Sequence, residues 1–310
     1  MAKYAFTRPL ARLAEIEQAF SRKDLKRVCE ASERSFAEAY DMETVWVDQP
    51  APENFYFYKD NGSNILAVAH LDTVGHADDR TARFVVTEGG GTVVFSRALD
   101  DRLGAYIILE LLPKLGLKYD ILLTVGEESG MSTAAFFEPP KGKEYDYMIE
   151  FDRGGTDVVM YQYDDVEVRD LVKAAGARVG DGSFSDISYL GHLEIKGFNW
   201  GVGYQDYHGP RAHAFLDDTF AMVSRYLTFA QQNEGVYMPH YATEDERPWS
   251  SRMMDYDWDD ARQNDPWAAG PSSPNEWEWD DADAPEWREY PSLQEIDDAI
   301  ARDKDGAHVH

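Results

Sequence analysis

The chain has 310 residues, of which 43% are hydrophobic, so it is long enough and apolar enough to fold around a substantial core. Its 58 acidic and 30 basic residues give a net charge of −28, which argues against binding to nucleic acid or to an anionic membrane surface. A single cysteine, Cys29, excludes an intrachain disulfide framework and a thiolate-rich zinc site. No apolar run approaches the roughly 20 residues of a membrane span. The first residues lack the apolar stretch of a signal peptide, so we expect a cytoplasmic protein.

Strand-like and helical patterns alternate along the first 240 residues. Apolar side chains recur at helical spacing over residues 8–40, and further helices are expected at 101–115 and 211–231. Runs rich in β-branched and aromatic residues predict strands at 44–47, 55–58, 65–69, 83–86, 92–95, 120–125, 147–151 and 157–161. The glycines at 89–91 join two of these strands into a hairpin. We predict an α/β three-layer sandwich, a mixed and mostly parallel twisted sheet with helices on both faces.

The last 70 residues have a different composition. From Tyr241 to His310 there are 20 acidic and 6 basic residues, together with six of the eight tryptophans. Helical periodicity is missing until about residue 295, so this segment cannot bury enough aliphatic surface to offset its ordering entropy. We therefore predict a folded domain over 1–240 and a largely extended or disordered acidic tail over 241–310, with a short terminal helix. The tail docks on the body or on a partner, or has no specific function.

Polar side chains collect where the predicted strands end. His70 and Asp72 follow strand 65–69, and on extended chain their side chains point to the same side. Asp72 can then hold one imidazole nitrogen of His70 and leave the other free for a metal. A simple hydrogen-bonded pair is the alternative.

The other strand ends carry more carboxylates and a second histidine. They comprise Asp100 and Asp101 before a helix, Glu127 and Glu128 after strand 120–125, Asp152 after strand 147–151, and His208 in a loop bounded by glycine and proline. Taken alone, Asp100 or Asp101 is best explained as a helix N-cap. The adjacent carboxylates of Glu127 and Glu128 repel each other unless they are exposed or cations neutralise them.

The ordered set of two histidines and several carboxylates, without thiolates, suits zinc, with cobalt or manganese as substitutes. The histidines disfavour the alternative of a structural calcium site. The number of anionic ligands predicts two metal ions that share one aspartate. Such ions, about 3.5–4 Å apart, clamp a bridging water and polarise a carbonyl group.

Four motifs resemble those of the zinc exopeptidase superfamily, which contains dizinc aminopeptidases, carboxypeptidases and deacylases. They are AlaHisLeuAspThrVal (69–74), AlaLeuAspAspArgLeuGly (98–104), GlyGluGluSerGly (126–130) and the late loop histidine, within residues 60–230. The resemblance implies one zinc bound by His70, Asp100 and Asp152, and a second bound by Asp100, Glu128 and His208. It also implies that Glu127 is the general base and that Asp72 orients His70.

Spacing favours a compact branch of this superfamily. Only 28 residues separate Asp72 from Asp100, and only 56 separate Asp152 from His208, too few for the inserted domains of other branches. The form around Asp152 is not the commonest, so Glu150 is its alternative. His213 and His192 are the alternatives to His208. Residues 182–190 are expected to line or support the site. Three residues that flank the predicted ligands, Arg153, Tyr204 and Tyr207, are expected to contact substrate, with a scaffold role as the alternative.

The expected activity is amide or peptide hydrolysis, with an aminopeptidase as the first choice and a peptide or an N-acyl amino acid as substrate. A deacylase or a carboxypeptidase is the alternative on the same site. A different class of function, a binding or decoy protein acting through the acidic tail, is also open. The sequence leaves the oligomeric state undetermined.

Overall fold

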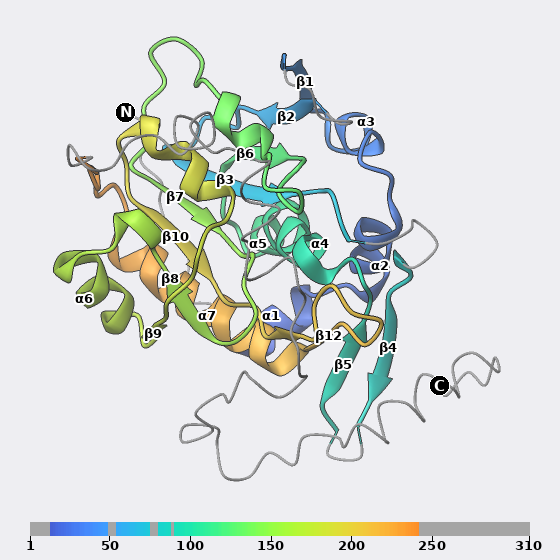
Figure 1. Cartoon of the computed structure of the whole chain (residues 1–310). Coiled ribbons are helices and arrows are strands. Elements are labelled where there is room, and N and C mark those ends of the chain that lie inside the picture. Colours follow the sequence, from blue (N-terminus) through green and yellow to red (C-terminus); the bar gives the residue numbers. More distant parts are fainter. Residues whose placement is uncertain (1–12, 49–53, 75–79, 88–89, 242–310) are drawn as a thin grey trace, which may run out of the picture. The chain divides into compact units, whose positions relative to one another are not determined.

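The computed structural model describes residues 13–48, 54–74, 80–87 and 90–241 (Figure 1). The chain divides into two units, Met1–Glu246 and Arg247–His310, and all elements below belong to the first. The predicted helical start at residues 8–12 and nearly all of the acidic tail, with its terminal helix, lie outside the described residues. The division into 1–240 and 241–310 therefore stays a prediction. Among the helices of the described part, none combines the length and the apolar composition that a bilayer crossing requires.

The described chain opens with three short helices, α1 (Leu13–Ala19), α2 (Arg22–Glu30) and α3 (Ser35–Tyr40). Ser21 separates the first two, because its side-chain oxygen accepts a hydrogen bond from the backbone N–H of Asp24 at 3.2 Å and caps α2. The apolar positions of the helical pattern form the buried faces, which carry Ile16, Leu25, Val28, Cys29 and Phe36.

Eight strands form the main sheet in the order β1-β2-β6-β3-β7-β10-β8-β9. Their bounds are β1 (Glu43–Trp46), β2 (Phe55–Lys59), β3 (Ile65–His70), β6 (Asp120–Thr124), β7 (Tyr147–Glu150), β8 (Asp157–Val159), β9 (Arg178–Val179) and β10 (Gly197–Trp200). The central strands β6, β3, β7 and β10 run parallel, whereas β1–β2, β2–β6 and β8–β10 pair antiparallel. The predicted mixed, mostly parallel sheet is confirmed.

Helical segments cover both faces of this sheet. Successive residues of a strand point to opposite faces, so Tyr147 of β7 packs against Phe229 of α7 (Leu216–Gln232), while Glu150 faces Ser185, the residue before η5 (Asp186–Leu193). Phe20 contacts both Tyr106 of α4 (Leu99–Tyr106) and a ring of α7. The helical bounds are α4 (Leu99–Tyr106), η2 (Ile107–Leu111), α5 (Leu112–Lys114), η3 (Thr133–Phe136), η4 (Tyr161–Tyr163), α6 (Val166–Ala174), η5 (Asp186–Leu193) and α7 (Leu216–Gln232).

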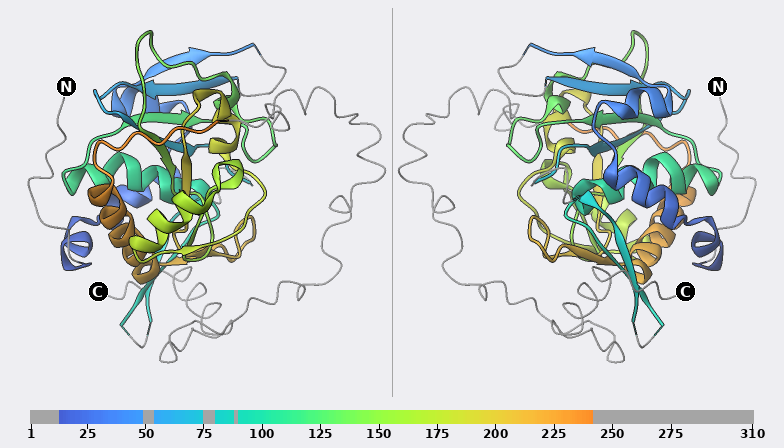
Figure 2. Two further views of the ribbon diagram at one scale, coloured as in Figure 1. Left: turned by 90° about the vertical axis from the view of Figure 1, so that its left-hand side faces the viewer. Right: turned by 90° about the vertical axis from the view of Figure 1, so that its right-hand side faces the viewer.

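A second, antiparallel sheet has the order β11-β12-β5-β4, built from β4 (Arg83–Val86), β5 (Thr92–Phe95), β11 (Tyr204–Gln205) and β12 (His213–Phe215). Figure 2 shows its β4–β5 pair, the predicted hairpin, extending away from the main sheet. The prediction of a helix from residue 211 was wrong over its first turn. Residues 213–215 pair with β5 instead, and α7 begins at Leu216.

Candidate metal centre

The carboxyl ends of β3, β6 and β7 meet at one edge of the main sheet because these three strands are parallel neighbours. His70 is the last residue of β3 and pairs with Thr124, the last residue of β6. Glu127 and Glu128 follow in the loop after β6, and Asp152 lies just beyond β7. The strand order thus brings together segments that are far apart in the sequence.

His70 is fully buried, and its two ring nitrogens have different neighbours. Nδ1 donates to the backbone carbonyl of Asp72 at 2.9 Å, with a carboxylate oxygen of Asp72 at 3.5 Å. Because a carbonyl oxygen can only accept, Nδ1 carries a proton, and in the neutral ring Nε2 keeps its lone pair. Nε2 lies 3.2 Å from Asp100 Oδ1, 3.7 Å from Asp152 Oδ1 and 3.8 Å from Glu127 Oε2. The orientation that Asp72 was expected to impose thus comes mainly from its backbone.

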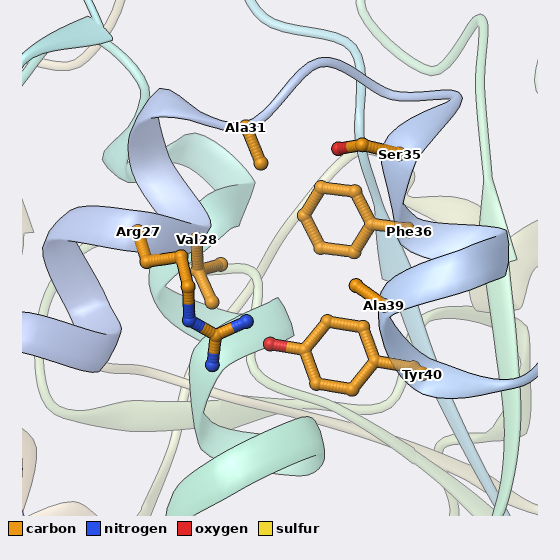
Figure 3. Close-up of a pocket in the computed structure, with 7 residues that line it drawn as sticks. All are labelled: Arg27, Val28, Ala31, Ser35, Phe36, Ala39 and Tyr40. Atoms are coloured by element: carbon orange, nitrogen blue, oxygen red, sulfur yellow. The ribbon is translucent and has the colours of Figure 1, made fainter.

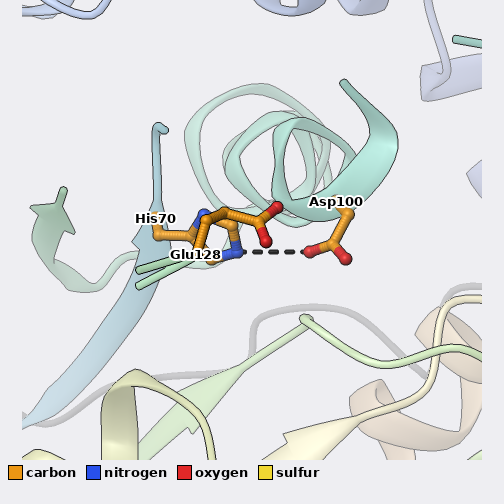
Figure 4. Close-up of side chains that lie close together, drawn as sticks. All are labelled: His70, Asp100 and Glu128. Atoms are coloured by element: carbon orange, nitrogen blue, oxygen red, sulfur yellow. Dashed lines mark hydrogen bonds and ion pairs between the residues drawn. The ribbon is translucent and has the colours of Figure 1, made fainter. Parts of the chain in front are cut away.

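Asp100 stands between the two histidines. Its Oδ1 faces His70, and its Oδ2 lies 3.0 Å from Nε2 of His208. The same His208 nitrogen lies 2.9 Å from Glu128 Oε2. Figure 4 shows His70, Glu128 and Asp100 converging from three separate segments of the chain. One carboxylate therefore presents one oxygen to each of two imidazoles, which is the arrangement expected of a ligand shared by two cations.

The helix-cap explanation for Asp100 does not hold in the structure. The N-cap position of α4 is Ala98, and the backbone dihedrals of Asp100 are not helical. The neighbouring Asp101 caps the backbone of the helix instead, because its Oδ1 accepts a hydrogen bond from the backbone N–H of Gly104 at 3.1 Å. The two adjacent carboxylates consequently point to different partners.

Asp152, and not its alternative Glu150, adjoins His70. The hydroxyl of Tyr204 donates to Asp152 Oδ1 at 2.7 Å, and the amide of Asn199 bonds to the backbone of Asp152 in both directions. Glu150 is fully buried behind the site and accepts from the hydroxyl of Ser185. Tyr204 therefore fixes the same carboxylate oxygen that approaches the His70 ring.

His208 lies in the loop between β11 and β12, and its side chain is 44% exposed. Its two alternatives are engaged elsewhere. His213 is buried and bonds through Nδ1 to the carbonyl of Arg211 at 2.8 Å, and His192 bonds through Nε2 to the carbonyl of Phe137 at 2.8 Å. Within the described part of the chain, only His208 joins His70 in this cluster of carboxylates.

The three flanking residues named from the sequence have different surroundings. Tyr204 contacts the cluster directly through Asp152. The exposed Tyr207 packs edge-on against the His208 ring, with a centroid distance of 4.8 Å. Arg153 turns away and pairs with Asp157 at 2.6 Å. Of these three side chains, that of Tyr207 is the most exposed.

Sequence reasoning did not single out Asp186, and it did not place Asp101 and Glu150 beside it as buried carboxylates behind the site. Asp186 is fully buried and accepts from the hydroxyls of Thr124 and Ser132. Asp101 and Glu150 are buried at the same level, and each keeps one oxygen without a hydrogen-bond partner among the described residues. The signal for Asp186 was its place in the segment 182–190, which was expected only to line or support the site.

The crowded carboxylates set the protonation of the histidines. Burial disfavours the charged form of His70, but Asp152 and Asp100 outweigh this effect and raise its pKa well above the usual value. His208 responds in the same way: burial opposes its charge, yet hydrogen bonds to Asp100 and Glu128 raise its pKa to about 10. Without cations, protons on the histidines balance part of the negative charge.

Two carboxyl groups, those of Glu127 and Asp152, have raised pKa values because their surroundings disfavour the charged form. Burial first, and then repulsion from neighbouring carboxylates, raise the pKa of Glu127 to about 9 and that of Asp152 to about 7. Asp100 differs, because hydrogen bonds from His208 and His70 outweigh its burial and lower its pKa. Because these groups must lose protons to bind metal, divalent cations are expected to displace protons from the site.

The residues present fit divalent metal ions. Ligand atoms of His70, Asp100 and Glu128 lie within 4.8 Å of one another. Glu128 Oε1 is buried without a hydrogen-bond partner among the described residues, an orphan that a cation would satisfy. Imidazole and carboxylate ligands without thiolates are the donor set expected for zinc, cobalt or manganese.

We expect the metal-free protein to lose stability as pH rises. The pKa of Glu127 is about 9 in the folded chain against an ordinary value of 4.5, and that of His208 is about 10 against 6.5. The folded state therefore binds more protons than the unfolded state between about pH 5 and 9, which makes the free energy of unfolding fall with pH. Urea midpoints of chelator-treated protein at pH 6 and pH 9 test this. A midpoint that rises with pH would contradict the placement of these groups.

Replacing Tyr204 by Phe is expected to weaken metal binding by roughly 10–100-fold, the usual effect of losing a hydrogen bond to a metal ligand. The change removes only the hydroxyl that donates to Asp152 Oδ1 at 2.7 Å. Isothermal titration with zinc measures the effect. Tyr237→Phe, at an exposed tyrosine, is the control and should bind as the parent does. Equal affinities for all three proteins would show that Tyr204 does not support a ligand.

Solved structures with a similar fold include two peptidases. Aminopeptidase PepT from Bacillus cereus matches with a TM-score of 0.51 and 11% identity, over 71% of this chain and 98% of that chain. A tripeptidase from Staphylococcus aureus matches with a TM-score of 0.50 and 11% identity, over the same shares of the two chains. No family profile and no curated protein matches the sequence. The likeness is thus one of fold, and it confirms the α/β sandwich that the sequence predicts.

Proposed function

We propose that this chain, which shares its fold with these peptidases, is a two-metal hydrolase of amide or peptide bonds, with zinc as its metal and aminopeptidase as its activity. The observation that carries this proposal is the position of Asp100, whose two carboxylate oxygens face the Nε2 atoms of two different histidines. A helix cap or a simple ion pair does not require both oxygens to meet a histidine. A carboxylate that bridges two cations, each of which also binds one of the histidines, would have this position.

The proposed ligand sets follow from these neighbours. His70, Asp100 and Asp152 would hold one ion, and Asp100, Glu128 and His208 the other. Asp72 keeps the His70 ring in the tautomer that offers Nε2, and its Oδ2 also accepts from the backbone N–H of Glu128 at 3.1 Å. Asp72 thus steadies a ligand of each ion.

Glu127 is the proposed general base. Its Oε2 lies 3.8 Å from Nε2 of His70, and its side chain is only 12% exposed, so it borders the cluster without being fully enclosed. Bound divalent ions would polarise the scissile carbonyl and lower the pKa of the attacking water. Glu127 would take a proton from that water and return it to the leaving amine. In the metal-free chain burial raises the pKa of Glu127 to about 9, so Glu127 can act as a base only where bound cations lower this pKa.

A screen with added metal tests the proposed function. Purified full-length protein is incubated with zinc, cobalt or manganese and with aminoacyl amides, N-acyl amino acids and dipeptides. We expect cleavage of aminoacyl substrates that a chelator stops and added metal restores. Cleavage of N-acyl amino acids alone would make the protein a deacylase, and cleavage that the chelator does not affect would refute the metal-dependent mechanism.

A further inference from the structure

Arg102 is a fully buried arginine next to the proposed metal ligands. Its Nε donates to the backbone carbonyl of Leu71 at 2.8 Å, and one of its terminal nitrogens donates to the carbonyl of Val28 at 3.0 Å. Its guanidinium also lies 4.8 Å from the centre of the Phe36 ring. Arg102 therefore ties the segment that carries Asp100 to the segment that carries His70.

Glu33 links Arg102 to a second arginine, Arg80. The Oε1 atom of Glu33 lies 3.2 Å from a terminal nitrogen of Arg102 and 2.6 Å from one of Arg80. Arg80 in turn donates through Nε to the hydroxyl oxygen of Thr73 at 3.1 Å. All three charged side chains are mostly buried, since at most 14% of each is exposed. We call Glu33, Arg80 and Arg102 the Glu33 network.

The Glu33 network contacts the segment that carries His70 at two residues. Leu71 and Thr73 alternate in the chain with His70 and Asp72, so a contact at each of them fixes the turn that carries the imidazole. The second ligand segment is held through Arg102, only two residues after Asp100. The carboxylate of Glu33, which lies between α2 and α3, therefore links the segment that carries His70 to the segment that carries Asp100.

Packing alone does not explain this connection. Val28 and Phe36, which contact Arg102, also line a pocket of about 220 Å³ between α2 and α3 (Figure 3). A buried arginine also needs a counter-charge, which Glu33 supplies.

We infer that Glu33, Arg80 and Arg102 are positioning residues that set the distance between His70 and Asp100 and so tune the affinity of the metal centre. This inference rests on the proposed function, because it assumes that these two residues bind metal. Ligand atoms must be held within about 0.5 Å of their working geometry, and a network anchored outside the sheet supplies that constraint. Glu33 has no contact with the ligands themselves among the described residues.

The test compares cobalt binding by the full-length parent and by Glu33→Gln, which keeps the size of the side chain and removes its charge. We expect two equivalents of cobalt in the parent. In Glu33→Gln we expect a Kd about 10–100-fold higher, together with a changed visible absorption spectrum of the bound ions. The spectrum reports ligand geometry, so a residue that only stabilises the fold would leave it unchanged.

Two more variants complete the design. Asp164→Asn removes a matched carboxylate that pairs with Arg169 at the surface, and it should bind cobalt as the parent does. Thr73→Val removes only the acceptor of Arg80 and should weaken cobalt binding about fivefold, and it decides the question if Glu33→Gln does not fold.

The outcomes separate the two hypotheses. A parent that binds no cobalt would overturn the proposed function, and this inference with it. This inference alone would be overturned if the parent bound two equivalents of cobalt and either Glu33→Gln or Thr73→Val kept the parental Kd and absorption spectrum. A lower melting temperature of that variant would then show that the replaced residue only stabilises the fold.

Discussion

Glu127→Gln is expected to lower kcat by about 10²–10⁴-fold while metal content stays at the parental level. The amide keeps the size of the side chain but cannot accept the proton of the attacking water. Glu127 is not among the proposed ligands, so its replacement leaves the cation sites intact. Steady-state hydrolysis of an aminoacyl amide, measured beside metal content by elemental analysis, checks both halves of this expectation.

The matched control is Glu144→Gln, which makes the same chemical change at an exposed glutamate and should retain full activity. A Glu127→Gln protein with parental kcat would exclude Glu127 as the base. If activity and metal content fell together, Glu127 would be a ligand instead, a role for which its 3.8 Å approach to His70 leaves room.

Asp100→Asn is expected to disrupt both cation sites at once. Its two oxygens face different histidines, so loss of the charge removes a ligand from each site. Removing one partner from a buried charge pair costs about 3–5 kcal/mol, which corresponds to a loss of roughly 10²–10⁴-fold in affinity for each ion. Zinc titration should then show two weakened sites in place of two tight ones, and chelator-sensitive turnover should disappear.

Asp101→Asn is the control for this experiment, because Asp101 is the adjacent buried aspartate and faces Gly104 instead of the histidines. Burial raises the pKa of Asp101 well above its usual value, so an uncharged side chain is already the favoured state there. Loss of one ion only in Asp100→Asn would mean that the carboxylate is not shared. Equal losses in both variants would mean that the effect is not specific to Asp100.

The central strands were predictable because a strand that is buried on both faces is a nearly continuous apolar run in the sequence. The runs at 65–69, 120–125 and 147–151 became β3, β6 and β7 with shifts of no more than one residue at either end. The start of α7 was not predictable, since residues 213–215 owe their strand conformation to pairing with the distant β5. The helix α6 and the strand β10 were also missed, because α6 contains three valines and β10 contains a glycine and an asparagine, residue types that disfavour those elements.

The candidate ligands were foreseeable because each follows a strand or opens a helix, and the ends of parallel strands converge. The choice between Asp152 and Glu150 needed the structure, since the two differ by which way the chain turns after β7. Tyr204 was singled out because it flanks the predicted ligands, although its contact with Asp152 needed the structure. Glu33 was not foreseeable as a support, because its role depends on a contact with Arg102 across 69 residues.

The most direct test of a shared Asp100 is anomalous diffraction from crystals of the full-length protein grown with zinc and measured at the zinc absorption edge. We predict two anomalous peaks about 3.5–4 Å apart, one on the His70 side of Asp100 and one on the His208 side. A single peak, or zinc located away from these two histidines, would contradict the two-metal centre.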